Sequence, residues 1–271
     1  MKNKKLKLFT IPYAVWMLFF VIIPIFIIGY YGITDSNGNF TLANIFSITQ
    51  YEHYKSLFLA IYLAIICTVI CLLIAYPLAL ILRKLDPKLS GTLIFIFLLP
   101  MWMNMLLRTL AWQILLERKG VINALLTMAH LPTLNIINTN AAVVLGMVYD
   151  FLPFMVMPVF NSLSKIDDSV IDAASDLGAK YHTVLFKIII PLSIPGIVSG
   201  VTMVFIPALT TFVISNILGG GRILLIGGLI EQEFMHASNW NLGSGLSIFL
   251  ILFVFVFIAI SMFFDDEEEL A

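Results

Sequence analysis

The sequence has few charged residues and no excess of positive charge. Charged residues make up 11% of its 271 residues and apolar residues 61%, whereas soluble domains carry roughly 25% and 45–50%. This shortage of charge excludes an ordinary soluble domain, and the net charge of −1 gives no indication of nucleic-acid binding. The mean hydropathy of +1.02 indicates that lipid solvates most of the chain.

Cysteines and catalytic motifs are equally scarce. The two cysteines, Cys67 and Cys71, lie in one apolar run, which excludes a four-cysteine metal site and a disulfide framework. The four histidines fall in four separate connecting segments, and the P-loop, H-E-x-x-H and G-x-S-x-G motifs are missing. We therefore expect no catalytic site, no metal and no cofactor in this chain, and a role in transport.

Long apolar runs, by contrast, are abundant. A helix needs about 20 mostly apolar residues to cross a bilayer, and six stretches qualify. They are residues 8–31, 57–82, 92–116, 141–163, 188–215 and 244–264. The first is too long for a signal peptide and is interpreted as a retained helix. The sequence predicts an all-α membrane protein with six transmembrane helices in a single domain, residues 1–271.

The basic residues predict the orientation of these helices. If the N-terminus is inside, the inner segments hold ten Lys and Arg residues and the outer segments only four, namely Lys55, Arg118, Lys119 and Arg222. Cytoplasmic segments of membrane proteins are enriched in these residues. Both termini are therefore predicted to be cytoplasmic.

The inner segment 164–187 has features of a folded loop. Asp167, Asp168 and Ser169 suit a helix N-terminus, because their side chains accept hydrogen bonds from unpaired amides and the acids favour the positive end of the helix dipole. Gly178 suits the end of the same helix. We expect a short amphipathic helix, a glycine turn and a second helix that enters the membrane.

This short helix carries an acidic face. Asp168, Asp172 and Asp176 follow one another at helical spacing, where like charges repel, and a basic partner surface would make the arrangement favourable. Small residues would let that partner approach, and one leucine could fill a pocket in it. These residues are Ala173, Ala174 and Gly178, with Leu177. The alternative is a solvated helix lying on the lipid headgroups.

The same segment resembles the EAA motif of ABC importer permeases. The motif reads E-A-A, three residues, G, nine residues and I-x-L-P, and here Asp172-Ala173-Ala174, Gly178 and Ile188-Ile189-Ile190-Pro191 stand at that spacing. Asp172 replaces the glutamate and Ile190 the leucine. The resemblance implies a type I ABC importer permease, in which this helix docks into a groove on a separate ATPase subunit.

Further segments resemble the spermidine/putrescine permeases of this family. They are Leu99–Trp102 with Leu107–Thr109, the run Gly146–Pro158, and Gly219–Arg222 with Leu224–Gly227. The resemblance implies polyamine import across a bacterial plasma membrane. The implied partners are a second homologous permease, two ATPases that hold ATP and Mg²⁺, and an extracytoplasmic polyamine-binding protein. The alternatives are the same architecture for another small solute, and a self-sufficient secondary transporter.

Two ionisable residues lie within the predicted spans. Arg108 and Asp150 are both roughly 12–14 Å from the outer ends of straight helices, at 1.5 Å per residue, so they could pair. Intramembrane charges indicate a functional site, and we expect Arg108 to position Asp150, unless the pair only fixes helix packing. Trp112 shares a helix face with Arg108 and could stack on its guanidinium.

A polyamine needs carboxylates for its ammonium groups and aromatic faces for its methylenes. The candidates for a substrate path are Trp102, Asn104, Arg108, Tyr149, Asp150, Phe151, Glu231 and Glu233. The two glutamates are the only acids in the last outer segment, where they could guide cations or contact a binding protein. For each candidate the alternative is a packing or solvated role. A separate pair of small residues, Gly196 and Gly200, predicts close approach of a neighbouring helix.

Overall fold

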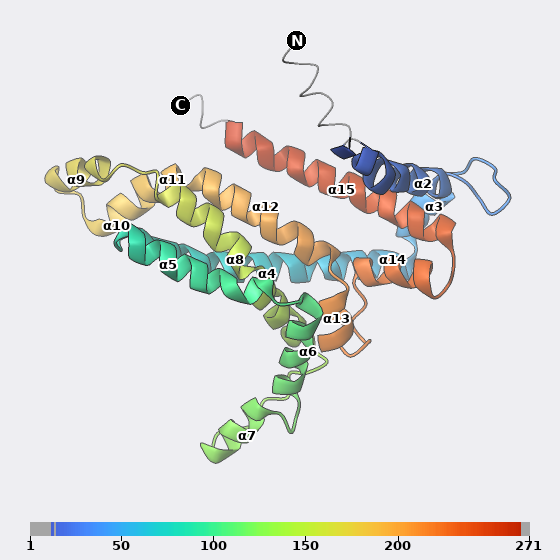
Figure 1. The fold of residues 1–271 in the computed structure, drawn as a ribbon, viewed down its shortest axis with the longest axis horizontal. Helices are drawn as coiled ribbons and strands as arrows, with labels where there is room; N and C mark the ends of the chain where they lie inside the picture. The colour runs from blue at the N-terminus through green and yellow to red at the C-terminus, as the bar shows by residue number, and fades with distance from the viewer. Residues whose placement is uncertain (1–11, 14, 267–271) are drawn as a thin grey trace, which may run out of the picture. The chain divides into compact units, whose positions relative to one another are not determined.

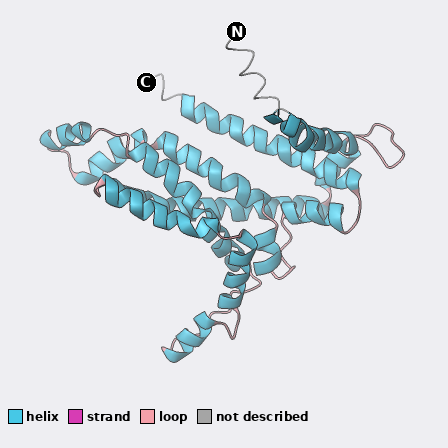
Figure 2. Ribbon diagram, viewed as in Figure 1, coloured by secondary structure: helices cyan, strands magenta, loops and turns pink. Residues whose placement is uncertain are grey.

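The computed structural model describes residues 12, 13 and 15–266, and within these residues it contains helices but no strand (Figures 1 and 2). The described residues form two compact units. One comprises the described part of 1–55 with 229–255, and the other comprises 56–228 with 256–266. The expected all-α architecture is confirmed.

The first unit is built around the start of the last long helix. Its elements are η1 (Leu18–Ile22, a π-helical turn), α2 (Ile23–Gly32), α3 (Ala43–Phe46), η2 (Ser47–Thr49), most of α14 (Ile226–Met235) and the first part of α15 (Trp240–Asp266). The Asn241 side chain donates to the carbonyl oxygens of Tyr31 and Thr34, at 3.1 and 2.6 Å. Asn44 donates to the same Thr34 oxygen at 2.8 Å. These bonds hold the end of α2 against the start of α15.

The second unit contains the predicted functional residues, apart from Glu231 and Glu233. Its elements are α4 (Tyr51–Arg83), α5 (Pro87–Leu98), η3 (Leu99–Trp102), α6 (Met105–Leu116), α7 (Val121–Met128), α8 (Asn140–Leu163), α9 (Asp168–Asp176), α10 (Tyr181–Val184), η4 (Leu185–Ile189, a π-helical turn), α11 (Ile190–Leu192), α12 (Ile194–Thr210) and α13 (Val213–Leu218).

Helices α8 and α12 pack side by side at the centre of this unit (Figure 1). A Cβ atom on Gly196 would lie 2.7 Å from the carbonyl oxygen of Pro158, and one on Gly200 would lie 2.6 Å from Sδ of Met155. Both distances are too short for real contacts. The predicted close approach at these two glycines is therefore confirmed. A larger side chain at Gly196 would push the helices apart, whereas one at Gly200 would first displace the Met155 side chain.

Four helices are long and apolar enough to cross a membrane. They are Val15–Gly32, Tyr51–Arg83, Asn140–Leu163 and Trp240–Met262. Two bent pairs qualify in addition if each pair counts as one span, namely Pro87–Trp102 with Met105–Met128 and Tyr181–Leu192 with Ile194–Thr210. These two pairs fall where the sequence predicts the third and fifth spans.

The 88° bend is the main difference from the span expected at 92–116, whereas the prolines of the span expected at 188–215 permit bending. The first pair is bent by 88° and the second by 62°. At the first bend, the Asn104 side chain accepts hydrogen bonds from the amides of Leu106 and Leu107 and so starts a new helix. At the second, Pro191 stands in the first turn of the short α11 and Pro195 in the first turn of α12, positions where proline is tolerated.

Candidate functional site

The segment with the EAA spacing folds into the helix and turn that the sequence predicts. Asp167 caps α9 by accepting a hydrogen bond from the Ser169 amide at 2.9 Å. This bond and one from the Ser169 side chain favour the charged carboxylate, so the pKa of Asp167 is lowered. Gly178 follows the helix with φ of +81°, a conformation that favours glycine. The chain then turns into α10.

Helix α9 presents its residues to solvent. None of its residues is buried, and the Leu177 side chain that follows is 89% exposed. Asp172, Ala173 and Asp176 are exposed, while Ala174 is half-buried. An exposed leucine beside small residues at a rigid turn is a surface that a partner can cover. Pro191, the last residue of the motif, lies apart from this surface in α11.

One aspartate of the predicted acidic face is already paired within this chain. Nη2 of Arg83 lies 2.6 Å from Oδ1 of Asp168 and also donates to the carbonyl oxygen of Ile166 at 2.9 Å. The Arg83 side chain is 11% exposed and that of Asp168 85%. The expectation that three aspartates await a basic partner is therefore wrong for Asp168. In the sequence Arg83 stands out only as one of the inner basic residues, and no local signal points to this contact.

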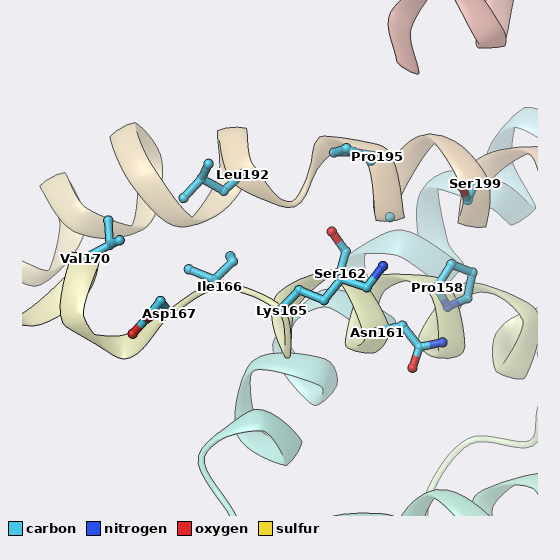
Figure 3. A pocket seen from close by; sticks show the side chains of 11 residues that line it. Pro158, Asn161, Ser162, Lys165, Ile166, Asp167, Val170, Leu192, Pro195 and Ser199 are labelled. Atoms are coloured by element: carbon cyan, nitrogen blue, oxygen red, sulfur yellow. The ribbon is translucent and has the colours of Figure 1, made fainter. Parts of the chain in front are cut away.

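The segment before α9 also lines a cavity of about 560 Å³ (Figure 3). Its walls come from the end of α8, from residues 165–167 and Val170, from Leu192 at the end of α11, and from Pro195 and Ser199 at the start of α12. The chain that leads into α9 therefore borders the same space as the two central helices.

The two intramembrane charges meet as the sequence suggests. Nη2 of Arg108 on α6 lies 3.2 Å from Oδ1 of Asp150 on α8, and both side chains are buried, at 9% and 3% exposure. Nη1 of Arg108 donates to the carbonyl oxygen of Pro100, also at 3.2 Å. Because of the bend at Asn104, however, the depth estimated for Arg108 on a straight helix does not apply.

The ion pair leaves hydrogen-bonding capacity unused. Among the described residues, Nε of Arg108 and Oδ1 of Asp150 have no hydrogen-bond partner, although the two charges are close. The pair is thus an electrostatic contact without an aligned hydrogen bond. A buried carboxylate oxygen with an open position can accept a hydrogen bond from a substrate ammonium group.

The aromatic candidates surround this pair unevenly. Trp112 packs edge-on against Tyr149, with ring centroids 5.3 Å apart. In the described part of the chain the cation–π contacts are those of Lys55 and Lys84, so the expected stacking of Arg108 on Trp112 is wrong. Phe151 is buried, whereas Tyr149 is partly exposed.

Four further candidates have other surroundings. Trp102 is 77% exposed and contacts Phe95 edge-on. Asn104 serves as the cap of α6. Glu231 and Glu233 are half-buried on α14 in the first unit. No group of three or more potential metal ligands occurs among the described residues.

Comparison with known proteins decides the family. No family model matches the chain. It is 35% identical over 243 residues to the spermidine/putrescine transport system permease protein PotB of Haemophilus influenzae, covering 87% of this chain and 85% of the relative. It is 36% identical to PotB of Escherichia coli K12, covering 87% and 88%. The chain belongs to the PotB family of ABC transporter permeases.

The PotB-family assignment agrees with two solved structures. A bacterial alginate ABC transporter in complex with an alginate-bound periplasmic protein matches with a TM-score of 0.80 at 14% identity, covering 96% of this chain and 93% of that one. A second alginate importer structure matches with a TM-score of 0.78 at 15% identity, covering 99% and 96%. These matches show the fold of an ABC importer permease. A PotB-family permease is one part of a permease, ATPase and binding-protein complex, and the ATPase is a separate subunit.

Proposed function

We propose that this permease imports polyamines, spermidine and putrescine, across a bacterial plasma membrane. The relatives named for this transport share 35–36% identity with it over 243 residues. The buried Asp150, with one oxygen open to a further hydrogen bond, is the observation in the molecule that carries the proposal. A polycation needs such a carboxylate along its path.

Arg108 positions Asp150 in this proposal. Its guanidinium is anchored to the Pro100 carbonyl and lies beside the carboxylate in an apolar surrounding. Tyr149 and Trp102, both partly exposed, offer aromatic faces to ammonium groups and methylenes. Because Arg108 offsets the charge of Asp150, a second homologous permease supplies further carboxylates.

Helix α9 is the contact with the ATPase in the same proposal. The exposed Leu177 fills a pocket of the ATPase, and Ala173, Ala174 and Gly178 allow its close approach. Asp172 and Asp176 face basic groups there, while Asp168 stays with Arg83. Two ATPases, holding ATP and Mg²⁺, close and pull α9. The movement reaches α8 and α12 through the chain bordering the cavity of Figure 3.

The test is ATP-dependent uptake by the reconstituted assembly. We expect labelled spermidine and putrescine to accumulate only with ATP, with both ATPases and with the binding protein. Asp172→Lys together with Leu177→Ala removes this uptake while the permease still folds, because both side chains are exposed. Unaided transport by the purified permease, or unchanged uptake by the double variant, would overturn the coupling role.

Another small solute is the second candidate. The same assembly would then hydrolyse ATP and move that solute while excess spermidine left its uptake unchanged. Competition between labelled spermidine and unlabelled sugars, amino acids or polyamines separates the two candidates.

A further inference from the structure

The face of α8 that carries Asp150 continues toward the end of the helix that the sequence predicts to be cytoplasmic. Phe154 and Asn161 follow Asp150 at intervals of four and seven residues, which places the three side chains on one side of an α-helix. Asp150 is buried beside Arg108, whereas Phe154 is 39% exposed and Asn161 is also exposed. This side of α8 therefore leads from the buried ion pair to the cavity of Figure 3, which Asn161 lines.

The wall of this cavity combines apolar side chains with oxygen atoms. The apolar part comes from Pro158, Ile166, Val170, Leu192 and Pro195, and the oxygen atoms belong to Asn161, Ser162, Asp167 and Ser199. Within the described part of the chain, the side chains of Asn161, Ser162 and Ser199 form no hydrogen bond, so their oxygens are open to a donor. Such a wall suits an alkyl chain that carries ammonium groups.

A cation of the chain itself already lies at this cavity. Lys165 follows α8, and Figure 3 shows its side chain extending along the end of that helix toward Ser162. The side chain is exposed, and among the residues that the structure describes its ammonium group forms neither a salt bridge nor a hydrogen bond. The acid in the wall, Asp167, instead caps α9. A tethered ammonium group thus shares the cavity with oxygens that would accept one from a substrate.

We propose that Lys165 is a tethered competitor of the substrate at the inner end of the path. This inference rests on the proposed function, because it needs a substrate with ammonium groups. A group on a short tether acts at an effective concentration on the order of millimolar. The Lys165 ammonium therefore competes for the cavity oxygens and repels a polyamine that enters from the cytoplasm. Lys165 favours release into the cytoplasm over rebinding from it.

The first test measures uptake against spermidine on the inner side. Proteoliposomes with the assembled permeases and ATPases are filled with ATP, Mg²⁺ and graded concentrations of unlabelled spermidine, and the binding protein delivers labelled spermidine from outside. Lys165→Gln is the test variant, and Lys165→Arg keeps the charge. Lys88→Gln is the matched control, because Lys88 is an exposed inner lysine that does not line the cavity. The ATPases are the same in every sample, so any effect of spermidine on them is shared.

We expect internal spermidine to halve the uptake rate of Lys165→Gln at a concentration about two- to fivefold lower than for the wild type, the effect of one exposed charge. Lys165→Arg and Lys88→Gln keep the wild-type concentration. An equal concentration in Lys165→Gln and the wild type would overturn the proposal. So would an equally large shift in Lys88→Gln, because the position of Lys165 in the cavity would then have no influence.

The second test locates the route without transport. The native cysteines, Cys67 and Cys71, are fully buried, so a membrane-impermeant thiol reagent reports on an introduced Asn161→Cys. We expect a positively charged methanethiosulfonate to label this cysteine in the assembly without ATP, and to label it faster when Lys165→Gln is added, because a like charge is removed. An unlabelled cysteine would mean that lipid or another subunit covers this face of α8, and the proposal would fall.

Failure of this inference can be told from failure of the proposed function. If neither the wild type nor any variant takes up spermidine, the substrate assignment fails and the inference falls with it. If all of them take it up and internal spermidine inhibits Lys165→Gln and the wild type alike, the inference about Lys165 fails alone.

Discussion

The two ion pairs of the second unit differ in their surroundings and therefore in what they can do. Arg83 and Asp168 are 2.6 Å apart, with the carboxylate 85% exposed, whereas Arg108 and Asp150 are 3.2 Å apart and both buried. The shorter pair is the weaker constraint on stability, because water solvates Asp168 whether or not Arg83 is present. Breaking the longer pair costs more free energy, because either charge alone would remain in an apolar surrounding.

The two ion pairs therefore suit different tasks. The buried pair joins α6 to α8, and Arg108 also bonds the Pro100 carbonyl across the bend at Asn104, so the pair sets the structure around the proposed path. The exposed pair joins the end of α4 to the start of α9 and can open without loss of the fold. A contact that opens and closes suits a segment that an ATPase moves. A contact that must stay closed suits the wall of a path.

The largest effect is expected from Arg108→Ala. It leaves Asp150 buried and unpaired, which costs about 3–5 kcal/mol in comparable sites. We expect the purified permease to lose most of its thermal stability, measured by its unfolding midpoint in detergent. Replacing both partners, with Arg108→Met and Asp150→Leu, restores much of that stability but not the uptake.

A comparable loss in that double variant and in Arg108→Ala would show that the unpaired charge is not the cause. The proposed path role would then have to be separated from packing in another way.

Exchanging the two charges of the buried pair tests whether the pair does more than fix helix packing. Arg108→Asp with Asp150→Arg keeps an ion pair but moves the carboxylate from α8 to α6 and leaves the Pro100 carbonyl without its donor. We expect partial recovery of stability relative to Arg108→Ala and uptake below one tenth of the wild type, an estimate of about 1.4 kcal/mol in the transport barrier. Full recovery of uptake would show that the pair only fixes helix packing.

These two pairs also show what the sequence can and cannot predict. Arg108 and Asp150 are visible in the sequence because charges inside apolar runs are rare and expensive. Arg83 is not, because it lies at the end of an apolar run where basic residues are common, and its partner is 85 residues away. The α9 helix and its glycine turn follow from local capping signals, Asp167 and Gly178, and were predicted correctly.

The bends in the predicted spans show what hydropathy alone cannot predict. The hydropathy of residues 92–116 indicates that they lie in lipid but gives no information on the direction of the helix. It therefore cannot predict the 88° bend between the two helices of this pair. Asn104 was a candidate for the path because on a straight helix it shares a face with Arg108. Its side chain is instead used to cap α6, a signal that a polar residue after a proline-containing turn already offered. Helix caps inside predicted spans are therefore worth testing as breaks.

A smaller effect is expected from Arg83→Ala. The exposed pair contributes on the order of 1 kcal/mol or less to the free energy of unfolding, and less at high salt. We expect a slightly lower unfolding midpoint, and a clear fall in spermidine transported per ATP hydrolysed, because α9 loses its tie to α4. Arg83→Lys should recover part of the ratio. Wild-type coupling in Arg83→Ala would remove the pair from the mechanism.

The smallest effect concerns the cap beside the exposed pair. Hydrogen bonds from Ser169 lower the pKa of Asp167 below the ordinary 3.8, so the charged cap stabilises α9 above pH 3.8 and this stabilisation is lost as the pH falls through the lower folded pKa. We expect the Asp167 carboxyl carbon, followed by NMR in isotope-labelled permease, to titrate below pH 3.8. Ser169→Ala should raise that pKa only part of the way, because the backbone amide, which contributes most to the shift, remains. A wild-type titration at or above 3.8 would mean that Asp167 does not cap α9 in the membrane, and that Arg83 alone holds the start of the helix.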